Sequence, residues 1–111
     1  MRWTLTCLLL LLSVSAALML RMSSIAVRKA TEADIAKLGI RSWPTWGCGV
    51  SKFPWTYGDS ETCYIIKGKV TVTPSGGEPV SIEAGDIATF PEGMSCTWDV
   101  TEAISKHYTF N

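Results

Sequence analysis

Residues 49–68 read GVSKFPWTYGDSETCYIIKG, with aromatic and acidic residues at fixed distances from two glycines. The anchor residues, with gaps of five, one, three and six residues between them, are Gly49, Trp55, Tyr57, Glu61 and Gly68. Side chains two positions apart in a strand point to the same face, so we expect the rings of Trp55 and Tyr57 to lie together. The segment therefore predicts a strand with two aromatic residues on one face, followed closely by a carboxylate.

A second glycine frame lies at residues 85–96, which read GDIATFPEGMSC. Its anchor residues, with gaps of five, one and two residues between them, are Gly85, Pro91, Gly93 and Cys96. Cys96 and Trp98 are two positions apart and are expected to share a face. The glycines of both frames fit tight turns between short strands, because glycine adopts positive φ without a Cβ penalty.

The residues after Trp43-Pro44 follow a pattern typical of strands. Lys69–Thr73 alternates strictly, with Val70 and Val72 on one face. The strands that we expect lie at residues 62–66, 69–73, 79–82, 87–90, 95–100 and 103–110. Short strands at even spacing, broken by Gly and Pro, predict an all-β sandwich or barrel.

One short helix is expected near the start of the domain, over residues 32–38. Thr31 at its N-cap, with Asp34 three residues on, matches a capping box. Gly39 suits the left-handed position that ends a helix.

The two frames resemble the cupin motif pair, over about residues 40–110. In metal-binding cupins the positions of Trp55, Tyr57 and Cys96 hold histidine, so this chain keeps only Glu61 of the ligand set. Three runs, WPTWGCGVSKFPWTYGDSETCYIIKGKV, IEAGDIATFPEGMSCTWDV and KHYTF, are similar to small single-domain cupins grouped with the (S)-ureidoglycine aminohydrolase cupin domain. The resemblance implies one jelly-roll barrel, over residues 25–111, which is often a homodimer. It also implies that the frame residues converge inside the barrel mouth.

We expect no bound metal and no other cofactor. Tryptophan donates only through its ring N–H, and a neutral tyrosine is a poor ligand for divalent ions. Glu61 and Cys96 alone supply too few donors for a tight site. His107, the sole histidine, would complete a zinc-binding set only if it pointed inward.

The leading hypothesis for function is a cupin that binds a small polar metabolite. The expected ligand-binding residues are Trp55, Tyr57, Glu61, Cys96 and Trp98. A metal-independent enzyme is a second hypothesis, with Glu61 as acid or base, Cys96 as nucleophile or hydrogen-bond partner and His107 as proton shuttle. Its substrate, by family analogy alone, would be a ureido or amino compound. The alternative is a structural or protein-interaction cupin whose aromatic residues fill the barrel without catalysis.

Composition narrows the class of protein. The 111 residues suffice for one domain, and the formal net charge is zero. Without a basic block we expect no nucleic-acid partner. Cys48, Cys63 and Cys96 indicate no disulfide framework and suit small buried positions. Trp43 and Trp46 are expected to pack outside the barrel or at a dimer contact.

Residues 1–24 are expected to be a targeting leader. Arg2, the apolar run 5–14 and Val14-Ser15-Ala16 have the layout of a secretory signal peptide with a cleavage site. Left uncleaved, the segment would be a membrane anchor, because about 18 residues with few polar groups just span a bilayer. Residues 17–30 also suit the second part of a plastid leader. Translation from Met22 would instead give a cytosolic protein.

Overall fold

The computed structural model describes residues 25–111, and the expectations for a leader or an anchor over residues 1–24 lie outside them. Of the stretch 17–30, residues 26–29 form a strand of the domain. The elements in chain order are β1 (Ala26–Lys29), α2 (Glu32–Leu38), the 3-10 turn η1 (Ile40–Ser42), β2 (Thr45–Cys48), β3 (Ser51–Thr56), β4 (Glu61–Pro74), β5 (Val80–Glu83), β6 (Asp86–Phe90) and β7 (Ser95–Phe110). Strands dominate, so the predicted all-β class with one short helix is confirmed.

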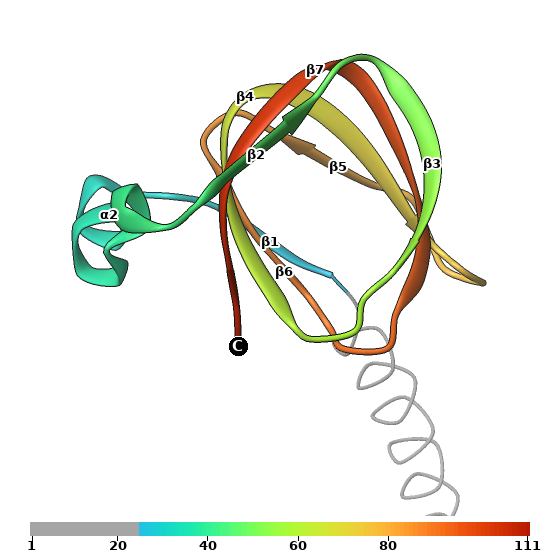
Figure 1. Cartoon of the computed structure of the whole chain (residues 1–111), viewed down its shortest axis with the longest axis horizontal. Helices are drawn as coiled ribbons and strands as arrows, with labels where there is room; N and C mark the ends of the chain where they lie inside the picture. The colour runs from blue at the N-terminus through green and yellow to red at the C-terminus, as the bar shows by residue number, and fades with distance from the viewer. Residues whose placement is uncertain (1–24) are drawn as a thin grey trace, which may run out of the picture.

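The strands curl into a barrel in which every pairing is antiparallel (Figure 1). The strand order is β1-β6-β4-β7-β2, with β3 also paired to β7 and β5 to β4. The long strands β4 and β7 pair along most of their length. The first half of β4 also pairs with β6, and its second half pairs with β5. The arrangement is consistent with a jelly roll.

A bulge lets β4 take part in both halves of the barrel. The register between β4 and β7 shifts between Ile65 and Val70, around Gly68. The shift changes the inward-facing positions of β4 from odd numbers, such as Cys63, to even numbers, such as Val72. Gly68 lies inside β4, and Thr101 lies inside β7. The predictions of separate strands at 62–66 and 69–73, and at 95–100 and 103–110, were therefore wrong, because each pair is one continuous strand.

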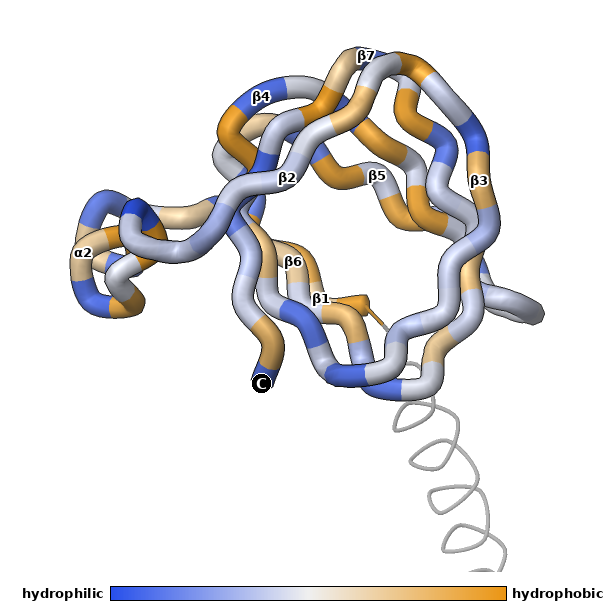
Figure 2. Tube along the Cα trace, in the orientation of Figure 1, coloured by the Kyte–Doolittle hydropathy of each residue, from blue (hydrophilic) through white to orange (hydrophobic). Residues whose placement is uncertain are grey.

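The core lies inside the barrel. Its buried residues come from β4 to β7 and from Tyr57, and they include Ile65, Val70 and Phe90. Hydrophobic and hydrophilic residues alternate along β4 and β7 (Figure 2), as expected for strands with one buried face. Three of the four frame glycines that anchor turns, Gly68, Gly85 and Gly93, have positive φ, whereas Gly49 does not.

The helix α2 lies outside the barrel wall (Figure 1). Its predicted bounds and caps are confirmed: the Thr31 hydroxyl accepts a hydrogen bond from the Asp34 backbone N–H, and the Asp34 carboxylate accepts one from the Thr31 N–H. Gly39 ends the helix in the left-handed conformation. Ile35 packs with Ile40 of η1 and Ile87 of β6 in a small second cluster that attaches the helix to the sheet.

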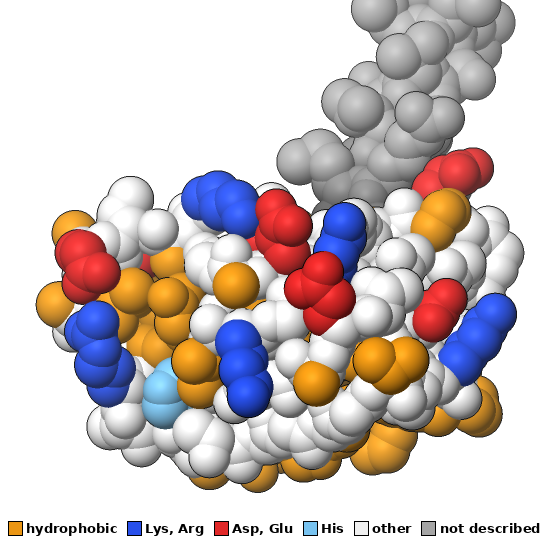
Figure 3. Space-filling model, turned by 90° about the horizontal axis from the view of Figure 1, so that it is seen from above, with side chains coloured by type: hydrophobic (Ala, Val, Ile, Leu, Met, Phe, Trp, Pro, Cys, Tyr) orange, Lys and Arg blue, Asp and Glu red, His pale blue; other side chains and the backbone are white. Residues whose placement is uncertain are grey.

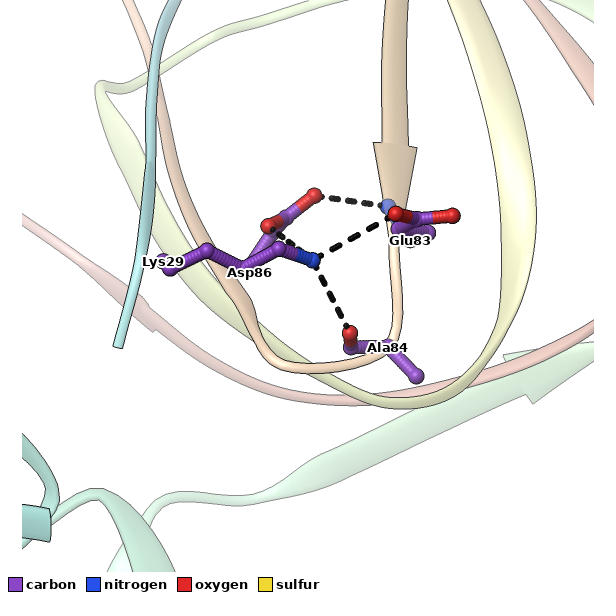
Figure 4. Close-up of polar contacts among 4 residues, drawn as sticks. All are labelled: Lys29, Glu83, Ala84 and Asp86. Carbon is purple, nitrogen blue, oxygen red and sulfur yellow. Dashed lines mark hydrogen bonds and ion pairs between the residues drawn. The ribbon is translucent and has the colours of Figure 1, made fainter. Parts of the chain in front are cut away.

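The strand β1, which the sequence pattern did not predict, is held by pairing with β6 and by Lys29 (Figure 4). The Lys29 ammonium lies 2.9 Å from the Asp86 carboxylate and donates to the Ala84 carbonyl at 3.4 Å and to Glu83 at 3.4 Å. The hydrogen bond to Asp86 is the main cause that raises the pKa of Lys29. Asp86 also accepts from the Glu83 backbone N–H at 2.9 Å, which braces the turn between β5 and β6.

The surface carries charges of both signs. Basic and acidic side chains lie near one another on the face seen in Figure 3, and hydrophobic side chains lie between them and along the lower edge of this view. Within residues 25–111, no helix has the length and apolar character needed to cross a membrane.

Candidate small-molecule pocket

A cavity of about 220 Å³ opens at one side of the barrel interior. Most of its wall is aromatic, with one acidic and one basic residue. The lining residues are Trp46, Phe53, Trp55, Tyr57, Glu61, Trp98, Lys106, Tyr108 and Phe110. They come from β2, β3, β4 and β7 and from the residue that follows β3.

The alternation of β7 explains much of this wall. Residues two apart on a strand share a face, and on β7 the even positions Trp98, Lys106 and Tyr108 all line the cavity. Glu61 begins β4, which pairs with the second half of β7. Two strands far apart in sequence thereby bring the acid and the base of the pocket together.

Glu61 and Lys106 form a buried ion pair. The Lys106 Nζ lies 2.7 Å from Glu61 Oε2, and their side chains are only 8% and 7% exposed. No charged partner for Glu61 was expected from the sequence, yet Lys106 balances its charge inside the pocket. Removal of one partner of such a pair leaves an uncompensated buried charge, which costs about 3–5 kcal/mol.

The Lys106 ammonium is also surrounded by rings. Its Nζ lies 4.8 Å from the ring centroid of Trp98, 5.2 Å from that of Trp46 and 5.9 Å from that of Tyr108. A cation within about 6 Å of an aromatic face is attracted by roughly 0.5–2 kcal/mol per contact. Both the carboxylate and the rings therefore attract the ammonium and hold it in place.

Tyr57 supplies an uncharged hydroxyl to the pocket. Its ring stacks on Phe90 with centroids 4.8 Å apart, and its hydroxyl accepts a hydrogen bond from Trp98 Nε1 at 3.1 Å. Burial, and next the negative charge of Glu61, raise the pKa of Tyr57 well above its ordinary value. The hydroxyl thus keeps its proton, and its hydrogen bond within the described residues is the one that it accepts from Trp98.

The mouth of the pocket is lined by partly exposed rings. Trp55, Trp46 and Phe110 are 52%, 41% and 57% exposed. Trp55 meets Tyr57 edge-to-face at 6.4 Å, as their shared strand face predicted. Trp46 was expected outside the barrel or at a dimer contact. It contacts Phe53 and Trp98 in the pocket wall, because β2 pairs with β7 opposite Lys106.

Cys96 does not line the cavity. Its short side chain is 4% exposed and stays in the core, with Sγ 3.6 Å from the Trp55 carbonyl oxygen, while longer neighbouring rings reach the cavity. Burial raises the pKa of Cys96, and it raises that of Cys63 to about 12. Both thiols therefore stay protonated, which argues against Cys96 as the nucleophile that the sequence suggested.

His107 also lies away from the cavity. It occupies an odd position of β7, so it points to the opposite face from Lys106. Its Nδ1 lies 3.0 Å from the Trp43 carbonyl oxygen, on the side of η1. The structure thus brings together Trp55, Tyr57, Glu61 and Trp98 of the predicted residues but separates Cys96 and His107 from them.

The residues present do not fit a metal ion. No three His, Cys, Asp or Glu side chains gather at one point within residues 25–111. Among the described residues that line the cavity, Glu61 alone carries a carboxylate, and its Oε2 is already bound to the Lys106 ammonium, whose positive charge would repel a cation.

Sequence reasoning missed Lys106, and a signal for it was present. The residues Cys96, Trp98, Ile104 and Lys106 share even numbering along what is one continuous strand. A single period-two pattern over residues 95–110 would have put a lysine on the core side. The same alternation places Phe53 with Trp55 on one face of β3. It also places Tyr108 and Phe110 with Lys106 on one face of β7.

The barrel, the glycine frames and the pocket together define a cupin. The model of the EutQ-like cupin domain family matches residues 35–108. The chain belongs to this family, which confirms the cupin resemblance at that level.

Solved structures agree with this assignment. A DUF861 family protein from Thermotoga maritima is 42% identical, with 78% of this chain and 99% of that chain covered and a TM-score of 0.77. The Clostridium difficile EutQ protein is 18% identical, with coverage of 76% and 64% and a TM-score of 0.55. A putative ethanolamine utilization protein Q from Salmonella typhimurium is 23% identical, with coverage of 76% and 66% and a TM-score of 0.54. The last two share the fold alone. None of the curated proteins compared with the chain matched it.

Proposed function

We propose that the protein binds a small, flat, uncharged molecule with an amide or ureido group in the pocket around Glu61 and Lys106. The observation that supports this most is the cavity itself, which side chains line but do not fill. At about 220 Å³ it lies below the roughly 300–1,000 Å³ of sites for drug-sized ligands, so the ligand is small. The same cavity argues against a barrel filled throughout by its aromatic residues.

The polar groups of the pocket indicate the ligand class. Glu61 offers its second oxygen as an acceptor, since only Oε2 is bound by Lys106, and Tyr57 offers its hydroxyl proton as a donor. An amide or ureido group carries both a donor and an acceptor and would match both. The pair of opposite charges gives the pocket no net charge. The resemblance to the ureidoglycine aminohydrolase group suggests the same ligand class.

Calorimetric titration with methylurea and propionamide tests this proposal. Tyr57→Phe removes the donor and keeps the ring, so we expect affinity to fall about five- to tenfold, the effect of one hydrogen bond. Tyr64→Phe is the matched control, because Tyr64 packs beside the outer cluster at Ile35. If no small amide or urea binds the wild-type protein, or if both variants lose affinity equally, the proposal fails.

A second candidate is proton transfer to a bound ureido or amino compound without a metal. It is favoured by the position of a carboxylate and an ammonium 2.7 Å apart in the cavity wall. Glu61→Gln distinguishes the two functions. A variant that binds ligand but loses turnover supports an enzyme, whereas lost affinity with no turnover by the wild-type protein supports a binding protein.

A further inference from the structure

One lysine occupies a place in the pocket that has the chemistry of an ammonium-binding site. A carboxylate lies 2.7 Å from the Lys106 Nζ, and three aromatic rings lie at 4.8, 5.2 and 5.9 Å. Aromatic rings around a cation, completed by an acid, are a general means of recognising ammonium ligands. Here the cation belongs to the protein itself.

We propose that Lys106 is the specificity-determining residue of the pocket. Its ammonium fills a cation subsite formed by the Glu61 carboxylate and the three rings, and this subsite is part of the cavity wall. The wild-type pocket therefore admits uncharged ligands and excludes alkylammonium ions. The ligand preference in this inference rests on the proposed function, whereas the existence of the subsite does not.

The physical reason is competition for the same groups. In this subsite a ligand ammonium would need Glu61 Oε2 and the ring faces of Trp46 and Trp98, which Lys106 already engages. It would also bring a second positive charge close to the first in a poorly solvated space, where like charges repel strongly. An uncharged ligand avoids this repulsion and uses the oxygen that Lys106 leaves free.

Truncation of the lysine tests the subsite directly. Lys106→Ala removes three methylene groups and the ammonium beyond Cβ, and n-propylammonium has the same atoms. We expect this variant to bind n-propylammonium at least about tenfold more tightly than the wild-type protein, because the rings and the acid are now free. 1-Propanol, which has the same shape without the charge, is expected not to show this gain.

Three matched variants serve as controls, measured by calorimetric titration. Lys106→Met keeps the subsite filled with a neutral chain and is expected to bind no n-propylammonium. Lys106→Ala combined with Glu61→Gln lacks the acid and is expected to lose the gain. Lys67→Ala removes an exposed lysine of β4 and is expected to behave like the wild-type protein.

Folding provides a second readout, since Lys106→Ala leaves a buried carboxylate unpaired. A ligand that binds only the native state raises the midpoint of thermal unfolding. We expect n-propylammonium to raise it for Lys106→Ala, or to restore folding if the free variant is unfolded, and to leave Lys106→Met unchanged. No effect on Lys106→Ala, or equal binding by the wild-type protein, would overturn the inference.

The two proposals fail separately. If the wild-type protein binds methylurea but Lys106→Ala gains no affinity for n-propylammonium, the subsite is wrong and the proposed function stands. If Lys106→Ala gains that affinity but the wild-type protein binds no uncharged probe, the subsite is right and the proposed function is wrong.

Discussion

Among single residues, Lys106 gives the pocket its positive charge and balances the carboxylate of Glu61. In the metal-binding cupins that the chain resembles, a cation at the glutamate would be an ion held by histidines. Here the cation is an ammonium 2.7 Å from Glu61, and tryptophan and tyrosine stand at histidine positions of the first frame. The aromatic residues at the histidine positions and the buried lysine are thus compatible, because the lysine supplies the positive charge beside Glu61 that a metal ion would otherwise supply.

A double-mutant cycle measures the Glu61–Lys106 pair. Glu61→Gln and Lys106→Met are each expected to lower the free energy of unfolding by about 3 kcal/mol, because each leaves one buried charge alone. The double variant leaves no charge and should lose clearly less than the sum of the two. Urea denaturation of the four proteins gives the coupling. Strictly additive losses would mean that the two groups do not interact.

Metal content is a second prediction at this scale. Protein purified without chelators is expected to contain no stoichiometric transition metal by elemental analysis. The reason is that Glu61, the only carboxylate among the described residues that line the cavity, is already paired. Added zinc or manganese should leave the thermal midpoint unchanged. One bound ion per chain would contradict the ion pair as the resting state of the site.

Gly68 permits the close approach of β4 and β7. A Cβ there would lie 2.2 Å from the Ala103 carbonyl oxygen, and φ is +93°. Gly85 has nearly the same φ, +91°, with nothing within 4 Å. We expect Gly85→Ala to cost about 1–2 kcal/mol of stability from backbone strain alone, and Gly68→Ala about 3 kcal/mol or more, because the backbones must also separate. Equal losses in urea denaturation would show that the contact at Gly68 is unimportant.

Four of the predicted site residues reach the cavity because their placement follows from strand parity near fixed glycines. Trp55 and Tyr57 share a face of one segment, and their contact is local. The partner of Glu61 was not predictable by spacing from the frames alone, because Lys106 is 45 residues away and the contact depends on the register of β4 against β7. Cys96 was misplaced because a shared face does not distinguish a core position from a cavity wall.

At the scale of elements, both ends of α2 are determined by residues close to it in the sequence. Its caps need only residues 31–39, so the sequence predicts both ends correctly. The strands β4 and β7 were divided in the prediction because glycine and polar residues, as at Gly68 and Thr101, usually end strands. Here both strands continue, because a bulge accommodates these residues and the pairing of β4 with β7 resumes beyond it. The four-residue β1 lacked an alternating pattern and depends on tertiary contacts with β6.

The cap of α2 predicts a pH dependence. The hydrogen bond from Arg28, and next those from Thr31, hold the pKa of Asp34 at about 2, below its ordinary 3.8. A lowered native pKa gives stability that is present above the ordinary pKa and is lost as the pH falls toward the native one. The wild-type protein should therefore lose stability between about pH 4 and pH 2 more steeply than Asp34→Asn, measured by urea denaturation.

Glu32→Gln is the control for this prediction. Glu32 lies in the same turn but is 84% exposed, and its ion pair with Arg41 is long, at 3.5 Å. Glu32→Gln should therefore lose stability between about pH 4 and pH 2 nearly as the wild-type protein does. If Asp34→Asn follows the wild-type curve down to pH 2, the cap does not contribute as the structure indicates.

At the scale of the whole molecule, the tightly packed core and the candidate binding cavity occupy different parts of the barrel. The core around Phe90 and Val70 is fully buried, whereas the cavity is bounded by rings that reach solvent at Trp55 and Phe110. The helix and its cluster lie outside the barrel and contain Trp43. The tryptophans within residues 25–111 therefore report on two regions: Trp46, Trp55 and Trp98 on the pocket, and Trp43 on the outer wall.

Tryptophan indole signals in a ¹H–¹⁵N NMR titration with methylurea or propionamide test most directly whether this pocket binds a small uncharged molecule. We predict that the indole N–H signals of Trp46, Trp55 and Trp98 shift together and saturate with one Kd, while that of Trp43 does not move. Absence of any shift at the three pocket indoles, or a shift of Trp43 of equal size, would contradict the account.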